Sequence, residues 1–201
     1  MKMKITQASP HDSAVIARLI MLAMNHDCCQ YFAGEYHTLA DFERMMTRLV
    51  ERDDSQYSHR NTLVAHDEDS KVMGILVCYD GKDLRKLRQA FVEEAFAAFG
   101  RDFSSMDDET EAGELYLDSL AVEPRYRHRG VATALLKEAI GVASRRSIPA
   151  VGLLVDQGNP SAERLYQNLG FKRVNECRWG GHPMFHLQYI CTPKRSSDDC
   201  Q

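Results

Sequence analysis

The spacing of apolar residues separates segments that should be helices from segments that should be strands. Apolar residues recur at the repeat of a helix with one buried face in the segments 9–24, 42–52, 84–99, 130–146 and 160–169. Alternating or continuous apolar runs, which indicate strands, occupy the segments 2–8, 61–67, 71–79, 114–122, 150–155, 172–177 and 184–191. The polar and aromatic stretch 25–37 predicts a loop.

This order of elements predicts an α/β fold with one mixed sheet and helices on both of its faces. A chain of 201 residues has the length of one domain, and we expect that domain to span 1–191. The polar tail 192–201 is expected to be disordered. The acidic stretch 104–111 is most simply a solvated linker, and a cation-binding surface is the alternative.

Charge and hydropathy exclude several classes of protein. Lys and Arg number 25 against 29 Asp and Glu, which gives a net charge of −4 and excludes a generally basic nucleic-acid-binding protein. The longest apolar candidate for a membrane span, 14–24, is interrupted by Arg18 and falls short of the roughly 20 residues required. The segment 1–5 shows no secretory signal. We therefore expect a cytoplasmic protein with neither a nucleic-acid nor a membrane partner.

Cysteine and histidine spacing argues against a metal site. The six cysteines form no C-x-x-C pair, and the eight histidines show no H-E-x-x-H pattern. We expect reduced thiols and no metal. Cys78 and Cys177 are expected to be buried as small apolar residues. The cysteines are Cys28, Cys29, Cys78, Cys177, Cys191 and Cys200.

One turn combines the end of a strand with a basic, glycine-containing helix start. The strand at 114–122 ends before Pro124, and the segment 127–132 (RHRGVA) leads into the next helix. The first N–H groups of a helix have no partners within it and bind anions. The small residues of this segment leave room for phosphate oxygens, and its two arginines add positive charge. The alternative is a basic turn whose glycine allows close packing of the helix. Neither the Rossmann nor the P-loop glycine pattern is present.

The segment 127–132 resembles the R/Q-x-x-G-x-G/A signature of GNAT-type N-acetyltransferases, and 159–171 resembles that family's N-x-x-A-x-x-x-Y-x-x-x-G-F pattern. The resemblance runs from Glu114 to Phe171. It implies a single GNAT-like domain with a mostly antiparallel sheet of about seven strands, acetyl-CoA as cosubstrate and, as a family trait, a homodimer. It also implies that 84–111 is a helical insertion between the third and fourth strands.

The resemblance assigns the acetyl-CoA site to the end of the 114–122 strand, the turn after it and the helix at 160–169. The assigned residues are Leu120, Ala121, Val122, Arg127, His128, Arg129, Gly130, Val131, Ala132, Thr133, Asn159 and Tyr166. A backbone N–H of 120–122 would hold the thioester oxygen, where negative charge develops during transfer. Asn159 has two candidate roles, as the N-cap of its helix and, by resemblance, as a hydrogen-bonding partner of pantetheine.

Tyr166 is the candidate proton donor. A departing thiolate needs a proton, and a tyrosine with an ordinary pKa of about 10 still carries one at neutral pH. The family often has tyrosine here in that role. The alternative is an aromatic core residue, because Leu165 and Leu169 form an apolar pair beside it.

Asp118 is the candidate for handling the acceptor amine, which must lose a proton before it attacks. Strand alternation predicts that Asp118, Tyr116 and Leu120 share one face, with Glu114 more distant on the same face. Asp118 is either a base or cation anchor, or a structural hydrogen-bonding residue. Surface or packing roles are favoured over lining the acceptor site for a further group: His26, Asp27, Tyr31, Phe32, His128 and His182.

The sequence thus predicts an acetyl-CoA-dependent N-acetyltransferase that transfers directly to a small-molecule or peptide amine in a ternary complex. Neither motif contains a cysteine that would form a covalent intermediate. Two alternatives stay open: an inactive CoA-binding regulatory module, and an unrelated enzyme that binds a nucleotide or a phosphosugar.

Overall fold

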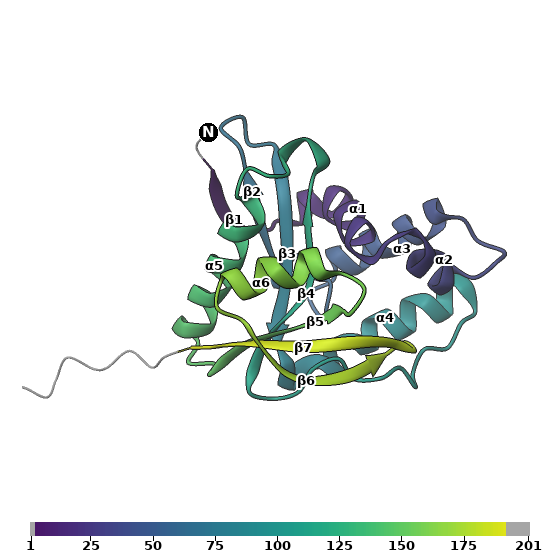
Figure 1. The fold of residues 1–201 in the computed structure, drawn as a ribbon. Coiled ribbons are helices and arrows are strands. Elements are labelled where there is room, and N and C mark those ends of the chain that lie inside the picture. The colour runs from purple at the N-terminus through teal and green to yellow at the C-terminus, as the bar shows by residue number, and fades with distance from the viewer. Residues whose placement is uncertain (1–2, 192–201) are drawn as a thin grey trace, which may run out of the picture.

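Seven strands form one sheet in the order β1-β2-β3-β4-β5-β7-β6 (Figure 1). The computed structural model describes residues 3–191. Only β4 and β5 pair in parallel, and all other neighbours pair antiparallel. The predicted mixed, mostly antiparallel sheet is therefore confirmed. The strands are β1 Lys4–Gln7, β2 Thr62–His66, β3 Val72–Asp80, β4 Glu114–Val122, β5 Ala150–Asp156, β6 Lys172–Trp179 and β7 His182–Ile190.

Helices cover both faces of the sheet, and each face has its own apolar core. One core joins the sheet to α1, α2, α3 and α4, and the other joins it to α5 and α6 (Figure 1). Because strand side chains alternate between faces, one sheet supplies both cores. The helices are α1 Ser13–Met24, α2 His26–Ala33, α3 Leu39–Glu51, α4 Leu84–Phe99, α5 Val131–Arg145 and α6 Pro160–Asn168.

Helix α2 corrects the predicted loop at 25–37. Asn25 caps it by accepting a hydrogen bond from the backbone N–H of Cys28 at 3.0 Å. The helix is one short amphipathic stretch whose buried Phe32 packs edge-on against Phe91 of α4, with ring centroids 5.1 Å apart. Eight residues are too few for a helical repeat to stand out. This helix therefore depends on tertiary packing rather than on a local signal.

A β-bulge in β4 corrects the predicted sharing of one face. Ser119 pairs with Val77 and Leu117 with Cys78, so Asp118 is an extra residue opposite no partner. An extra residue reverses the alternation beyond it. Leu120 accordingly packs in the α5–α6 core, whereas Tyr116 packs in the core under α1–α4.

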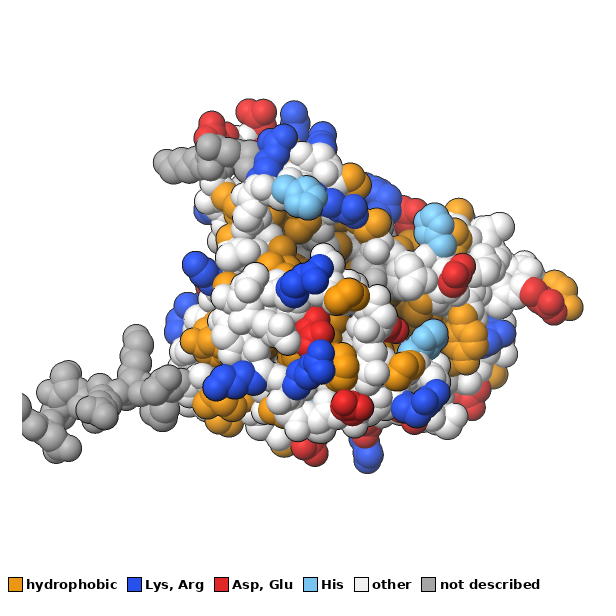
Figure 2. Space-filling view, in the orientation of Figure 1, with side chains coloured by type: hydrophobic (Ala, Val, Ile, Leu, Met, Phe, Trp, Pro, Cys, Tyr) orange, Lys and Arg blue, Asp and Glu red, His pale blue; other side chains and the backbone are white. Residues whose placement is uncertain are grey.

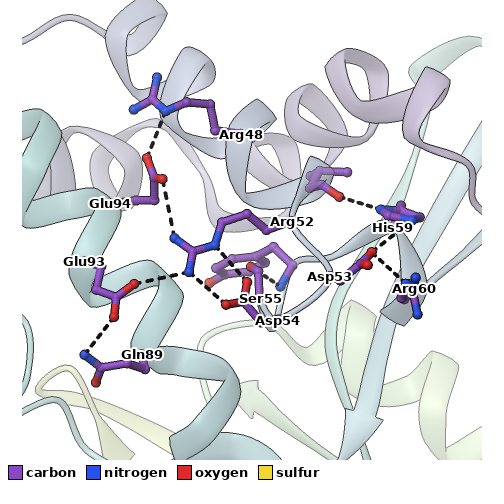
Figure 3. A network of polar contacts seen from close by, with 12 residues as sticks. Arg48, Arg52, Asp53, Asp54, Ser55, His59, Arg60, Gln89, Glu93 and Glu94 are labelled. Carbon is purple, nitrogen blue, oxygen red and sulfur yellow. Dashed lines mark hydrogen bonds and ion pairs between the residues drawn. The ribbon is translucent and has the colours of Figure 1, made fainter.

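Helix α4 lies against α3, and ion pairs join the two helices (Figure 3). The Arg48 Nε atom lies 2.9 Å from a Glu94 carboxylate oxygen, and Arg52 lies 3.2 Å from Glu93. Arg52 also binds Asp54 with two nitrogens, at 2.8 and 2.9 Å. Exposed pairs of this kind are each worth only about 0.2–1 kcal/mol. Their consequence is local, since they fix the start of the segment between α3 and β2.

Most residues of the acidic stretch 104–111 are exposed, as its composition predicts, but two of its carboxylates pair with arginines of α4. Asp108 forms ion pairs with Arg85 and Arg88, and Glu109 is buried in an ion pair with Arg88. The stretch thus folds back onto its own helix. The predicted tail 192–201 lies outside the described residues.

Candidate active site

Strands β4 and β5 part in the middle of the sheet. They pair at three positions, ending with Tyr116 opposite Gly152. From residue 117 onward β4 pairs only with β3 on its other side. Alternate residues of 117–122 therefore turn backbone N–H and C=O groups toward an opening rather than toward a strand. The predicted thioester-binding segment 120–122 lies along this opening.

The turn between β4 and α5 presents backbone donors to solvent. Gly130 is the N-cap of α5 and provides no side-chain cap. The first hydrogen bond of the helix runs from the N–H of Ala134 to the Gly130 carbonyl at 3.0 Å, which leaves the N–H groups of the preceding helical residues unpaired within the helix. Lys and Arg side chains gather over this turn at the top of the space-filling view (Figure 2).

Backbone conformation keeps this turn open. His128 and Gly130 have φ of 60° and 79°, in the left-handed region. A Cβ atom at Gly130 would meet nothing within 4 Å. Unpaired helix donors, exposed arginines and free space suit a phosphate group. The structure thus brings together all the residues assigned to this turn, from Arg127 to Thr133.

Gly74 of β3 seats α5 against the sheet, and the sequence gives no sign of this role. A Cβ atom at Gly74 would lie 2.7 Å from the Ala121 carbonyl oxygen and 3.2 Å from a Val131 methyl carbon. A glycine in a strand interior is a general sign of close approach. Which element approaches it becomes visible only in the folded chain.

Tyr166 lies on α6 with its ring in the α5–α6 core. The ring packs edge-on against Phe171, with centroids 5.8 Å apart. Burial raises the pKa of Tyr166 to about 12, so its hydroxyl keeps its proton at neutral pH. Within residues 3–191 that hydroxyl has no hydrogen-bond partner. The ring therefore packs as a core residue does, while the hydroxyl is uncommitted.

Asn159 occupies the position expected of a helix cap. Its side-chain oxygen accepts a hydrogen bond from the N–H of Ala162 at 3.1 Å. The predicted capping role is confirmed. The amide nitrogen of the same side chain remains available as a donor.

Asp118, the bulged residue of β4, is held by three side chains. It accepts hydrogen bonds from Tyr79 at 3.0 Å, from Gln56 at 3.2 Å and from Ser119 at 2.7 Å. It stays partly exposed, two residues beyond the last β4–β5 pair. Burial of its surroundings raises the pKa of the Asp118 carboxyl. Tyr166 and Asp118 thus belong to opposite faces of the sheet.

Sequence reasoning missed Glu109, Arg88 and Tyr79, which extend the group around Asp118. Glu109 is 8% exposed and forms an ion pair with Arg88. The Tyr79 hydroxyl lies 3.2 Å from Glu109. Burial, followed by the charge of Asp118, raises the pKa of Glu109 to about 7. No local spacing signals this group, because its members come from four separate segments.

Glu114 lies apart in its own polar cluster. It receives hydrogen bonds from Thr110 at 2.6 Å, His186 at 2.9 Å and Gln188 at 2.7 Å. Burial alone would raise the pKa of Glu114, but these hydrogen bonds outweigh it and lower the pKa. A Cβ atom at Gly152 would lie 1.7 Å from the Glu114 carboxylate, so this glycine makes the room.

A cavity of about 790 Å³ opens between α2, the 101–107 segment and the β6–β7 turn. Four of the six residues weighed for the acceptor side line it, namely Asp27, Tyr31, Phe32 and His182, whereas His26 and His128 do not. The Arg101 guanidinium also lines it and stacks 5.5 Å from the Tyr31 ring centroid. Asp102, Asp107 and Trp179 also line the cavity.

Burial keeps the thiols protonated. It raises the pKa of Cys78 to about 12 and that of Cys28 to about 11, which removes the thiolate a nucleophile requires. All cysteines of the described part are free. Cys78 is buried as predicted, whereas Cys177 is partly exposed. Among residues 3–191, no group of three or more His, Cys, Asp or Glu could hold a metal ion, and no helix has the length and apolarity to cross a membrane.

Known proteins resemble this chain in sequence and in fold. The model of the acetyltransferase (GNAT) family matches residues 23–171. N-alpha-acetyltransferase 30 of Xenopus laevis is 41% identical over 58 residues, which is 29% of this chain and 21% of that protein. The uncharacterised N-acetyltransferase YafP of Escherichia coli (strain K12) is 34% identical over 80 residues, 38% of this chain and 48% of its own. The matches thus span less than half of these curated relatives.

Solved structures extend the likeness over nearly the whole chain. A crystal structure of an acetyltransferase has a TM-score of 0.76 and 26% identity, covering 94% of this chain and 100% of its own. An N-acetyltransferase from Staphylococcus aureus Mu50 has a TM-score of 0.76 at 23% identity, covering 92% and 100%. The NatC complex bound to Gag peptide and CoA has a TM-score of 0.56 at 19% identity, covering 96% and 100%. The last two show the fold alone.

Proposed function

The chain belongs to the acetyltransferase (GNAT) family, and from this premise we propose that it transfers an acetyl group from acetyl-CoA directly to a primary amine in a ternary complex. One observation carries the proposal: the open helix N-terminus at Gly130 continues from the strand that parts from its neighbour at Tyr116. A phosphate-binding turn and a binding strand for the acyl arm are thus parts of one continuous segment.

This segment fits acetyl-CoA, which supplies the acetyl thioester. Arg127, Arg129 and the first N–H groups of α5 would hold its phosphates. The backbone N–H groups of 120–122 on the open side of β4 would bind the thioester oxygen. The amide nitrogen of Asn159 would donate a hydrogen bond to the pantetheine arm.

Two side chains on opposite faces of the sheet would transfer the protons. The Tyr166 hydroxyl, which has no other partner in the described chain, would donate its proton to the leaving sulfur. Asp118 would accept a proton from the acceptor amine at the β4–β5 opening. Two proton-handling groups on opposite faces allow donor and acceptor to enter from opposite sides.

The cavity at α2 and the β6–β7 turn would receive the acceptor. Its lining includes the carboxylates of Asp27, Asp102 and Asp107, which favour a positively charged amine. A small amine and the amino terminus of a peptide both meet this requirement. The N-alpha-acetyltransferase relatives, although similar over 58 residues only, make peptide amino termini the first acceptors to test.

Two assays test the proposal. Calorimetry should show that the protein binds acetyl-CoA and neither ATP nor NAD. A thiol-release assay with acetyl-CoA and a panel of peptides, polyamines, amino acids and aminoglycosides should then show turnover with at least one amine. Binding of ATP without CoA would contradict the proposal, and CoA binding with no turnover on any amine would leave only a CoA-binding module.

A further inference from the structure

One hydroxyl group lies between two carboxylates. The Tyr79 oxygen is 3.0 Å from an Asp118 oxygen and 3.2 Å from a Glu109 oxygen. A phenol has a single hydrogen, so it donates to only one of the two at a time. The second contact is favourable when the other carboxyl group is protonated and donates to the phenol oxygen. The arrangement therefore suits a pair of carboxyl groups that bind one proton between them.

The side chains around Glu109 come from the segment 84–111 and from the sheet. Arg88 forms an ion pair with Glu109 and is itself fixed by the Met106 carbonyl at 3.1 Å, the Asp107 carbonyl at 3.0 Å and Asp108 at 3.1 Å. The phenols of Tyr57 and Tyr116 are buried in the same core, and both carboxylates act on them electrostatically. Arg88 is thus the cation that makes a doubly ionised pair tolerable.

The surroundings of Asp118 differ, because its remaining donors are neutral. They are the Gln56 amide and the Ser119 hydroxyl. The backbone of Gln56 is tied to the segment 84–111, since its N–H donates to the Leu87 carbonyl at 3.2 Å. Arg88 therefore forms its ion pair at the Glu109 end, while Asp118 is partly exposed and lies two residues beyond the last β4–β5 pair.

We propose that Asp118 and Glu109 form one proton-accepting pair coupled through the Tyr79 hydroxyl, with Asp118 receiving the acceptor amine's proton and Glu109 holding it away from the transfer site. The inference rests on the proposed function for its reaction. Glu109 acts through Asp118 and is a positioning residue. Glu109 lies between α4 and β4, so the carboxyl pair depends on this segment of the chain.

The proton count closes over one cycle. Asp118 takes one proton from the ammonium group, and the freed nitrogen lone pair forms the N–C bond as the C–S bond breaks. Tyr166 protonates the sulfur, and the second proton lost by the nitrogen replaces the one that Tyr166 gave. The proton on Asp118 passes to the Tyr79 oxygen while the Tyr79 proton passes to Glu109. Glu109 releases it to solvent, and one proton leaves per turnover.

Two like charges close together make the pair a stronger base than either group alone. Burial and the charge of Asp118 raise the pKa of Glu109 to about 7, and burial raises the pKa of Asp118. The fully ionised pair exists above this value and gains a proton as the pH falls through it. Transfer should therefore be lost on the acid side with a midpoint near this pKa.

Removing Glu109 while keeping its neighbour tests the coupling. In Glu109→Gln, the acid midpoint of kcat/KM should move down by about one pH unit or more, because Asp118 loses the adjacent negative charge. Above the midpoint, kcat should fall by about tenfold, because the remaining base is weaker, while KM for the amine stays unchanged. Glu111→Gln is the control: it removes an exposed carboxylate two residues further along the same segment and should leave the pH profile in place. A Glu109→Gln profile that coincides with the wild type would overturn the pair.

NMR titration of the carboxyl groups tests the pair independently of acetyl transfer and without changing Glu109. In wild-type protein labelled with ¹³C at its carboxyl groups, two carboxyl resonances should titrate together with a step near pH 7. Tyr79→Phe, which removes the shared hydroxyl, should change the titration midpoints of both resonances and so identify them. Titration of both groups near the ordinary value of about 4 would exclude the pair even in an active enzyme. A step near pH 7 in a protein that acetylates nothing would support the pair and contradict the proposed function alone.

Discussion

The two sides of the β4–β5 opening are built in different ways. On the proposed donor side, one uninterrupted segment from 120 to 133 supplies a strand edge, a turn and a helix start, and the groups that it offers are backbone N–H groups. On the acceptor side, Asp118 meets Tyr79 across a sequence separation of 39 residues and Gln56 across 62. Local sequence therefore specifies the donor side, whereas packing assembles the acceptor side.

The difference also shows which segments build the acceptor side. The acetyltransferase (GNAT) family model matches residues 23–171, so it covers residues of both sides. The segment 84–111 contributes Arg88 and Glu109 to the acceptor side, and it fixes Gln56 through the Leu87 carbonyl. The two sides thus come from different segments of the chain.

Tyr166 packs on the α5–α6 face of the sheet, and the loss of its hydroxyl should have the largest effect. Tyr166→Phe keeps the ring against Phe171, so folding and acetyl-CoA affinity should be unchanged. Loss of a positioned proton donor should lower kcat by roughly 10²–10⁴-fold, with kcat/KM falling in parallel. The measurement is steady-state kinetics on an identified amine under conditions where chemistry limits the rate.

Tyr189→Phe is the matched control for Tyr166→Phe. Tyr189 also packs on Phe171, with ring centroids 5.7 Å apart, but it belongs to β7. Its loss of a hydroxyl should leave kcat within about twofold of the wild type. Near-normal kcat in Tyr166→Phe would assign Tyr166 to the core alone and leave acetyl-CoA binding unaffected.

The arginines of the turn should have the next largest effect, and on binding only. Changing Arg127 and Arg129 together to Ala removes charge-assisted contacts worth about 1.5–3 kcal/mol each, so acetyl-CoA affinity measured by calorimetry should fall well over tenfold. The double variant of Arg18 and Arg44 to Ala, on α1 and α3, removes the same charge from the other face and should bind normally. Equal losses in both variants would make the effect one of net charge.

Sequence alone anticipates the strand, the turn and the helix start of the donor side, because their signals are contiguous. The helix at 84–99 and the capping of α6 by Asn159 are likewise confirmed, since periodicity and capping are local properties. The strand boundaries differ from prediction by a few residues at most.

The features that the sequence does not predict each depend on a partner that is distant in sequence. Helix α2 exists because Phe32 packs against other aromatic rings. The bulge at Asp118 depends on the register with β3. The acidic composition of its segment predicts an exposed Glu109, yet this residue is buried in contact with Arg88 and Tyr79. Alternation and charge patterns carry no information about such pairings.

Glu114 and Glu109 are both buried carboxylates, but their pKa values shift in opposite directions. The pKa of Glu114 is lowered by hydrogen bonds, unlike that of Glu109, so Glu114 stabilises the fold above its unfolded pKa of about 4.3. That contribution is lost as the pH falls through the lower folded value. Glu114→Gln should cost about 1–3 kcal/mol at pH 7, and the difference from the wild type should shrink below pH 4.

Urea unfolding at pH 7 and at pH 3.5 measures this change. Glu176→Gln, on the exposed strand β6, is the control and should change stability by less than about 0.5 kcal/mol. A Glu114→Gln difference of the same size at both pH values would mean that packing, rather than charge, fixes this cluster.

The smallest expected effect comes from comparing two glycines, which distinguishes a loss of acetyl-CoA binding on the donor side from a general loss of stability. Gly130 and Gly100 both have positive φ, 79° and 65°, and a Cβ atom at either would meet nothing within 4 Å. Alanine at either position should therefore cost about 1–2 kcal/mol of stability through backbone strain alone. Only Gly130→Ala should also weaken acetyl-CoA binding, by several-fold, because only its turn presents N–H groups to phosphates. Equal affinity losses in both variants would mean that binding follows overall stability, and the donor side would then lack the local backbone site that distinguishes it from the acceptor side.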